Sequence, residues 1–306
     1  MYVKLVLAAV FWGATWTVGR MVVQEVPPFA AAFYRFVIAL VCLLAWLVHA
    51  EGGLPRWRPG IGWKLVGLGF TGIFLYNTFF LHGLQHIDAG RAALVVALNP
   101  ALIALVSAAL GQGRLGPVRG LGIVLALVGS VWVLSRGEPM TLLRDGVGLG
   151  ETLILGCVAS WTFYTFMGRS LTNTISPLAA NVGACTVGCV LLGGVAGVQG
   201  QLAWPTAYSW QAWACLGFLG LFGTALSYIW YTEGVKALGA AKAAVFINLV
   251  PLSGVLVAAA VLHERLPVAV WVGGLVTLAG VLMTTLAGAA KPAAPAATPP
   301  VTVSPP

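Results

Sequence analysis

The chain has 306 residues, of which 59% are hydrophobic and only 8% are charged. A soluble domain carries about 25% charged residues, so this composition excludes an ordinary soluble protein. It predicts an all-α polytopic membrane protein, in which apolar helices cross the bilayer repeatedly. The net charge of +8 does not indicate nucleic-acid binding, because the basic residues are scattered singly between apolar runs. The five cysteines also lie inside apolar runs without a CxxC pair, which indicates packing rather than disulfides or a metal site.

Ten apolar runs follow one another along the chain, each long enough to cross about 30 Å of hydrocarbon. We predict the spans at residues 3–22, 29–48, 62–81, 89–110, 118–135, 148–168, 178–198, 209–232, 240–262 and 268–287. The first run is interpreted as a retained helix rather than a cleaved signal peptide, because it contains Trp12, Gly13 and Trp16. Residues 289–306 are rich in Ala and Pro and are predicted to form a disordered cytoplasmic tail.

Basic residues predict the orientation of the helices, because Lys and Arg are enriched in cytoplasmic loops. With the N-terminus inside, most of the 16 Lys and Arg residues fall in inner loops or tails. The outer loops then hold Arg20, Arg91, Arg136, Arg144 and Arg265. We therefore expect a multi-pass protein of the cell inner membrane with its N- and C-termini both in the cytoplasm.

The chain contains an internal repeat. Residues 83–131 align without a gap with residues 234–282, and parts of the first and sixth spans also align. The matched pairs include Pro100 with Pro251, Arg114 with Arg265, Trp12 with Trp161 and Arg20 with Arg169. We therefore predict two repeats, residues 1–140 and 141–288, of five spans each. Because five is odd, the repeats insert with opposite orientation, which is typical of secondary transporters with a site near the midplane between the halves.

Several short motifs resemble those of the EamA type of the drug/metabolite transporter superfamily, in order and spacing. They are Phe11-Trp12-Gly13-Ala14-Thr15, Phe33-Tyr34-Arg35-Phe36, Ala89-Gly90-Arg91-Ala92-Ala93, Asn99-Pro100, Ala240-Ala241-Lys242-Ala243, Val250-Pro251 and His263-Glu264-Arg265-Leu266. The first repeat departs from the pattern at Gly113, where the second repeat has Glu264, so a functional role for Glu264 is not implied. The resemblance covers residues 3–287 and implies ten helices in two EamA repeats that export small metabolites. Amino acids are frequent substrates in this family, and one branch of similar length exports aromatic amino acids.

Polar and aromatic residues within the spans are the candidates for substrate binding, because polar groups that face lipid are costly. Arg35 has three open roles: it attracts a substrate carboxylate or acts in a gate, it clamps a neighbouring helix, or it reaches to the membrane interface. A cavity lined by aromatic rings suits an amphipathic or aromatic substrate, although such rings also gather at interfaces and between packed helices. The predicted substrate-binding residues are Trp12, Trp16, Arg35, Tyr76, Asn77, Phe80, Asn99, Trp161, Tyr164, Tyr228, Tyr231 and Asn248.

Pro100 and Pro251 lie in mid-span, where proline removes a helical hydrogen bond and kinks the helix. The nearby Asn99 and Asn248 can satisfy the backbone groups that the prolines leave free. We predict Pro100 and Pro251 as hinges, with a static kink as the alternative.

The acidic residues bear on energy coupling. All eight fall in loops or near span ends, with Glu151 and Glu233 the deepest. None lies in the first span, where the small four-helix multidrug antiporters of the superfamily that this chain resembles have theirs. The resemblance therefore disfavours cation/proton antiport and leaves open facilitated efflux, or coupling through water and the termini. An intramembrane enzyme is a distant alternative, because His263-Glu264 is followed by Pro267 where a metalloprotease motif needs a second His.

These observations predict a secondary transporter that exports small metabolites, with amino acids of aromatic or apolar side chain preferred, by alternating access. A carrier of lipids, drugs or nucleotide conjugates is the alternative. We expect no enzyme activity, catalytic residue, metal or cofactor. The expected partners are a small-molecule substrate and membrane lipids, without nucleic acid, for a protein taken as a monomer.

Overall fold

The computed structural model describes residues 1–53, 60–111, 116–144, 146–171, 174–202 and 207–289, which form helices joined by short turns. The predicted tail at 289–306 falls almost entirely outside the described residues. The helices are α1 Tyr2–Val22, α2 Pro28–Glu51, α3 Gly62–Leu68, η1 Gly69–Leu75, α4 Tyr76–Gly83, α5 Ala89–Val96, α6 Asn99–Ala109, α7 Pro117–Leu134, α8 Pro139–Arg144, α9 Leu149–Arg169, α10 Pro177–Val198, α11 Trp210–Gly217, η3 Phe218–Leu226, α12 Ser227–Leu238, α13 Ala240–Ile247, α14 Leu249–Val261 and α15 Val268–Ala289.

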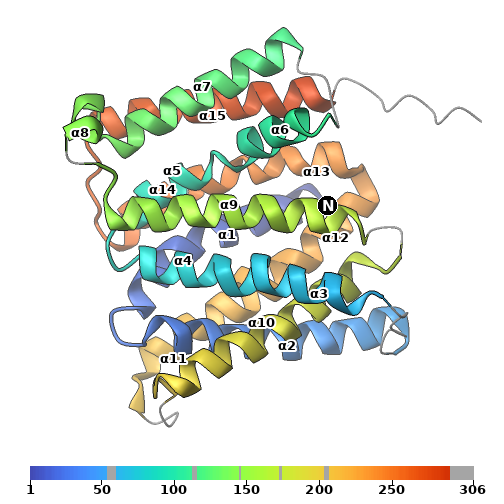
Figure 1. Ribbon diagram of the computed structural model, residues 1–306. Coiled ribbons are helices and arrows are strands. Elements are labelled where there is room, and N and C mark those ends of the chain that lie inside the picture. The colour runs from blue at the N-terminus through green and yellow to red at the C-terminus, as the bar shows by residue number, and fades with distance from the viewer. Residues whose placement is uncertain (54–59, 112–115, 145, 172–173, 203–206, 290–306) are drawn as a thin grey trace, which may run out of the picture.

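The predicted class of all-α polytopic membrane protein is confirmed. Nine helical stretches of the described residues are long and apolar enough to cross a membrane. They cover every predicted span except the sixth, which corresponds to α9. That helix has 21 residues and runs alongside the others through the bundle in Figure 1, but its sequence is more polar. The count of ten crossings therefore stays a prediction.

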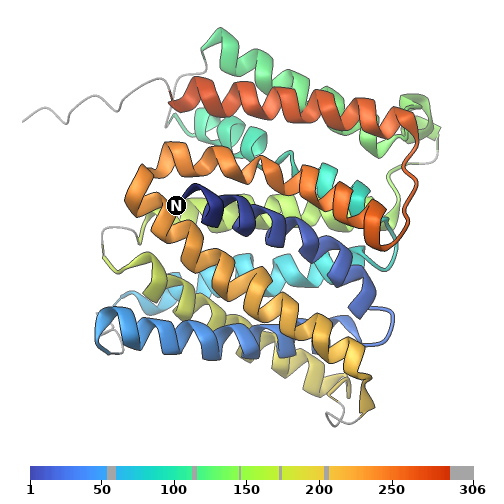
Figure 2. The ribbon, with the colours of Figure 1, turned by 180° about the vertical axis from the view of Figure 1, so that it is seen from behind.

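The long helices run back and forth between two ends of one bundle, as both views show (Figures 1 and 2). At one end α1 and α14 terminate and α5, α9 and α15 begin, and we call this the Glu264 end. At the other, α1 begins and α12 ends, and we call this the Lys4 end. The start of α1 and the end of α15 lie at the same end of the bundle (Figure 1).

α7 and α15 pack side by side at one edge of the bundle (Figures 1 and 2). Glycines at the contact allow the two backbones to approach. A Cβ on Gly129 would lie 2.6 Å from the carbonyl oxygen of Gly273, and one on Gly122 would lie 2.7 Å from that of Gly280. Small residues of this kind are the usual means of close helix packing in membranes. The contact joins the last helix of the first half, α1–α7, to the last helix of the second half, α9–α15.

The fourth and ninth spans are each broken near the middle. α5 ends at Val96 and α6 begins at Asn99 with Pro100 in its first turn. α13 ends at Ile247 and α14 begins at Leu249, two residues before Pro251. The predicted interruptions at the two prolines are thus confirmed as breaks, because proline is tolerated in the first turn of a helix and not in its interior. Their action as hinges stays a prediction.

The third and eighth spans contain π-helical segments, η1 and η3, at corresponding places in the two halves. Sequence reasoning predicted both spans as plain helices. π-helical segments are rare and frequently occur at functional sites. The side chains that lie near η1 and η3 are therefore candidates for the functional site.

Candidate substrate site

Arg35, in the second turn of α2, lies between the two π-helical segments. Its side chain donates from Nη1 to Oδ1 of Asn77 and from Nη2 to Oγ1 of Thr224, each at 3.1 Å. Asn77 is the second residue of α4, two residues after the end of η1, whereas Thr224 lies within η3. Arg35 therefore connects the first half of the protein to the second.

Both partners of Arg35 are held in turn by backbone carbonyls of the π-helical segments. The Asn77 amide donates to the carbonyl of Ile73 at 2.8 Å, and the Thr224 hydroxyl donates to that of Leu219 at 2.8 Å. The backbone of η3 also comes close to α2, since a Cβ on Gly220 would lie 2.7 Å from the carbonyl oxygen of Arg35. The shapes of η1 and η3 thus fix the direction of the guanidinium group.

The Arg35 side chain is buried without a carboxylate beside it. The residue is 8% exposed, and its Nε has no hydrogen-bond partner. The ion pairs of the described residues involve Lys4, Arg20 and Arg91, and none involves Arg35. The guanidinium carbon lies 5.1 Å from the centre of the Phe36 ring and 5.6 Å from that of Phe80. Rings stabilise a cation only partly, so the site retains an unneutralised positive charge, which is costly when buried.

A chain of aromatic rings leads from Phe80 into the second half. Phe80 contacts Trp16, with ring centres 4.9 Å apart, and stacks with Tyr76 at 6.1 Å. Tyr76 reaches Trp161 at 5.7 Å, and Trp161 reaches Tyr164 at 5.0 Å. These contacts link Trp16, Tyr76, Phe80, Trp161 and Tyr164 into one chain of rings, in which Phe80 lies beside Arg35. We call these five residues the ring cluster.

The remaining predicted residues lie outside the ring cluster. Trp12 pairs with Tyr231 at 5.4 Å, and the Tyr228 hydroxyl donates to the carbonyl of Pro177 at 2.7 Å. Asn99 and Asn248 sit at the two helix breaks, where Oδ1 of Asn99 and Nδ2 of Asn248 are buried without partners. In the part of the chain that the structure describes, no hydrogen bond joins either Asn to Arg35. These five predicted residues therefore do not gather at the guanidinium.

Sequence reasoning missed a buried ion pair at the Glu264 end. Arg91 was counted with the basic residues of the outer loops, although it lies at the start of the predicted span 89–110; the structure places it within α5, where it is 4% exposed. Its Nη2 lies 2.6 Å from Oε1 of Glu151 on α9, and the same side chain donates to the carbonyls of Val133 and Leu134. The pair joins the two halves. Arg91 lies only three residues after Asp88, and this nearness to the end of the span suggested a loop.

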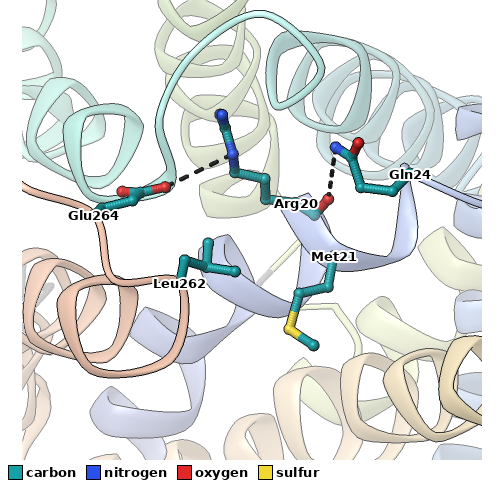
Figure 3. Close-up of a pocket in the computed structure, with 5 residues that line it drawn as sticks. All are labelled: Arg20, Met21, Gln24, Leu262 and Glu264. Atoms are coloured by element: carbon teal, nitrogen blue, oxygen red, sulfur yellow. Dashed lines mark hydrogen bonds and ion pairs between the residues drawn. The ribbon is translucent and has the colours of Figure 1, made fainter.

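A hollow lies at the Glu264 end, and Arg35 is not among the residues that line it. It is an open depression of about 330 Å³, lined by Arg20, Met21, Gln24, Leu262 and Glu264 (Figure 3). None of the predicted substrate-binding residues lines it. The only part of this depression that the sequence motifs include is the turn at Glu264. The first repeat has Gly113 at the corresponding position, so the sequence did not imply a functional role for Glu264.

Glu264 connects the second half to the first at this depression. Its carboxylate accepts the backbone N–H groups of Ala89 at 2.9 Å and Gly90 at 3.0 Å, and thereby caps the N-terminus of α5. The same carboxylate lies 3.7 Å from Nε of Arg20. Arg20 also pairs with Asp88 at 3.3 Å and donates to the carbonyl of Ile87.

A bundle of apolar helices in two halves, with a buried cation between them, defines a polytopic α-helical membrane protein. The sequence pattern of the EamA-like transporter family matches residues 1–135 and 148–286. The chain belongs to this family, whose fold is built from an inverted repeat. The predicted resemblance is confirmed, although its aromatic amino acid branch is not.

Three relatives illustrate the similarity. The chain is 27% identical to the uncharacterized transporter YyaM of Bacillus subtilis over 284 residues, covering 92% of both chains. It is 27% identical to the uncharacterized transporter YetK of the same organism over 300 residues, covering 97% of this chain and 90% of YetK. It is 28% identical to the uncharacterized inner membrane transporter YedA of Escherichia coli over 291 residues, covering 95% of this chain and 92% of YedA.

A solved structure, described only as the crystal structure of a protein, has the same fold. It superposes with a TM-score of 0.67 at 20% identity and covers 94% of this chain and 97% of that one. The family and the relatives are transporters, which supports the prediction that the chain is not an enzyme. The protein is therefore a multi-pass membrane transporter of small molecules.

Proposed function

We propose that this protein exports amino acids, with aromatic or apolar side chains preferred, across the inner membrane by alternating access of its two halves. In this proposal both termini lie in the cytoplasm. The observation that carries it is the Arg35 guanidinium, which is 8% exposed, lies between the halves, and has a free Nε and no carboxylate partner among the described residues. A substrate carboxylate would supply the missing negative charge.

The binding mode follows from the chemistry of the guanidinium group. Its planar fork matches a carboxylate with two parallel hydrogen bonds, and such charge-assisted pairs are about twice as strong as neutral hydrogen bonds. Asn77 and Thr224 hold two of the Arg35 nitrogens at 3.1 Å and would exchange one of these contacts for the substrate. The ring cluster beside Arg35 offers Tyr76 and Trp161 to an aromatic or branched side chain. Together these groups bind the polar and apolar ends of one amino acid.

The paired irregularities of the two halves support alternating access. The breaks at Pro100 and Pro251 and the segments η1 and η3 give each half the same places at which to bend. Contacts between the halves close both ends of the bundle. Arg91 pairs with Glu151 at the Glu264 end, and Lys4 pairs with Glu233 at 2.7 Å at the Lys4 end. In the proposed cycle these two sets of contacts break in turn.

Uptake of radiolabelled amino acids into proteoliposomes tests the proposal, with and without an imposed pH gradient. We expect saturable uptake of aromatic or branched amino acids that is lost in Arg35→Ala and reduced in Tyr76→Phe. Lys236→Ala is the matched control, because it removes an equal charge from an exposed position on α12 and should transport like the wild type. Absence of uptake of any amino acid under either gradient would overturn the amino-acid assignment and direct the search to lipids, drugs and nucleotide conjugates. Wild-type uptake by Arg35→Ala would remove Arg35 from the site.

A further inference from the structure

The depression at the Glu264 end brings opposite charges from the two halves to one solvent-facing surface (Figure 3). Arg20 at the end of α1 belongs to the first half, and Glu264, three residues beyond α14, belongs to the second. The Nε–Oε1 distance of 3.7 Å is that of an ion pair without a close hydrogen bond. The Arg20 side chain is 29% exposed and that of Glu264 10% exposed. A small polar solute can therefore reach the Arg20 side of the pair.

The lining of the depression matches the groups of a zwitterion. Arg20 offers a guanidinium to a carboxylate, and Glu264 offers a carboxylate to an ammonium group. Met21 and Leu262 provide apolar contact, and the Gln24 amide, which donates to the carbonyl of Arg20 at 3.3 Å, lies at the rim. The volume of about 330 Å³ lies at the lower limit of ligand pockets, which is typically about 300 Å³. A free amino acid with an apolar side chain fits within this volume and carries the matching pattern of charges.

We propose that the depression is a second amino-acid site, which binds the zwitterion with its carboxylate on Arg20, its ammonium group on Glu264 and its side chain against Met21 and Leu262. The inference rests on the proposed function, because it takes amino acids as the transported class. It differs from the Arg35 site in chemistry. Arg35 has no acidic partner among the described residues and binds the carboxylate alone, whereas the depression binds both charges.

The second site has a consequence for the contact between the halves. Separating Arg20 from Glu264 leaves the Glu264 carboxylate, which is only 10% exposed, without a cationic partner, and an unpaired charge that is largely buried is costly. A zwitterion placed between them replaces one ion pair with two, so the halves separate while both charges stay paired. Asp88 keeps its contact with Arg20, and the Ala89 and Gly90 amides keep theirs with Glu264. Occupancy of the depression should therefore favour opening of the Glu264 end.

The test reads the depression directly through Gln24, which is exposed at its rim. A Gln24→Cys variant is alkylated with a membrane-impermeant maleimide, and the chain without this substitution gives the background from its own five cysteines. The probes are L-leucine, its deaminated analogue 4-methylvalerate and its decarboxylated analogue isoamylamine. The reaction is followed with the central Arg35 intact and in an Arg35→Ala background. The second background separates direct protection from a conformational effect of the central site.

L-leucine at about ten times its Kd should slow alkylation about tenfold in both backgrounds, and the two singly charged analogues should not. Glu264→Gln should abolish the protection. Because Glu264 also caps α5, Leu262→Trp is a second variant that fills the depression while leaving both charges in place, and it should abolish protection as well. Arg265→Gln removes a neighbouring exposed charge and should leave the protection unchanged.

Four outcomes would overturn the second site. Protection that disappears in the Arg35→Ala background would show that the central site alone binds the amino acid. Equal protection by 4-methylvalerate would exclude recognition of the zwitterion. Absence of protection, combined with saturable Arg35-dependent transport, would refute this inference and leave the proposed function intact. If the wild type transports no amino acid, the proposed function fails and the inference fails with it.

Discussion

Removing one partner of the Arg91–Glu151 ion pair should destabilise the protein strongly. The two charges lie 2.6 Å apart, and their side chains are only 4% and 12% exposed. In Glu151→Gln the Arg91 guanidinium keeps its hydrogen bonds to the carbonyls of Val133 and Leu134 but loses its counter-charge. Breaking a buried pair on one side costs about 3–5 kcal/mol, most of it from the unpaired charge that remains.

The expected loss can be read from thermal unfolding in detergent at a fixed scan rate. At about 2 °C per kcal/mol for a chain of this size, Glu151→Gln should lower the apparent Tm by roughly 6 °C or more. The double variant Arg91→Met/Glu151→Met should recover part of the loss, because it leaves no charge unpaired. Lys4→Gln is the matched control, since the Lys4–Glu233 pair is 45% and 31% exposed, and exposed pairs contribute at most about 1 kcal/mol. A Glu151→Gln protein as stable as Lys4→Gln would refute the reasoning.

Two further predictions concern packing and pH. Gly129→Ala should lower the apparent Tm because its Cβ would lie 2.6 Å from a carbonyl of α15, whereas Gly120→Ala on the same helix meets nothing within 4 Å and should be neutral or slightly stabilising. The Ser209 hydroxyl and amide donate to Glu25 and hold the pKa of its carboxyl below the ordinary value of 4.5. The carboxylate therefore contributes stability above its unfolded-state pKa and loses it as pH falls through the lower folded-state pKa. The Tm difference between the wild type and Glu25→Gln should be fully present near pH 6 and should shrink progressively as pH falls below the ordinary carboxyl pKa of 4.5, and a constant difference would contradict this.

The fold was predictable because its main signals lie within single helices. Each apolar run predicts one membrane span, so α2 and α6 end close to the predicted ends of their spans. A proline within a run predicts a break in the helix. Pro28, Pro117 and Pro177 each begin a helix, as proline does where its missing N–H has no intrahelical partner. The repeat predicted the inverted arrangement, because five spans in each repeat, an odd number, give the two halves opposite orientations.

The contacts between helices were harder to predict from the sequence, because they depend on how each helix is rotated about its axis relative to its neighbours. Hydropathy places Arg91 near the start of a span but does not show that Glu151, which is 60 residues away in the numbering, lies on the facing side of α9. The π-helical segments change that rotation again within η1 and η3. The five members of the ring cluster are all among the predicted substrate-binding residues, because aromatic side chains within apolar spans are visible in the sequence. Their role in binding stays a prediction. Thr224, the partner of Arg35, had no sequence signal apart from being polar within an apolar run.

In the proposed cycle, the position of Arg35 couples binding of the substrate to movement of the two halves. The guanidinium touches Asn77, which follows η1, and Thr224 in η3, and these two segments occupy corresponding places in inverted halves. A substrate carboxylate that takes over one hydrogen bond therefore frees one π-helical segment while the other stays attached. Because the halves are inverted, the segment that is freed determines which end of the bundle can loosen. Thr224→Val, which removes one contact and keeps the side-chain shape, should therefore shift the balance between the two open states. Asn77→Leu should shift it in the opposite direction, which cysteine accessibility at the Lys4 and Glu264 ends can measure.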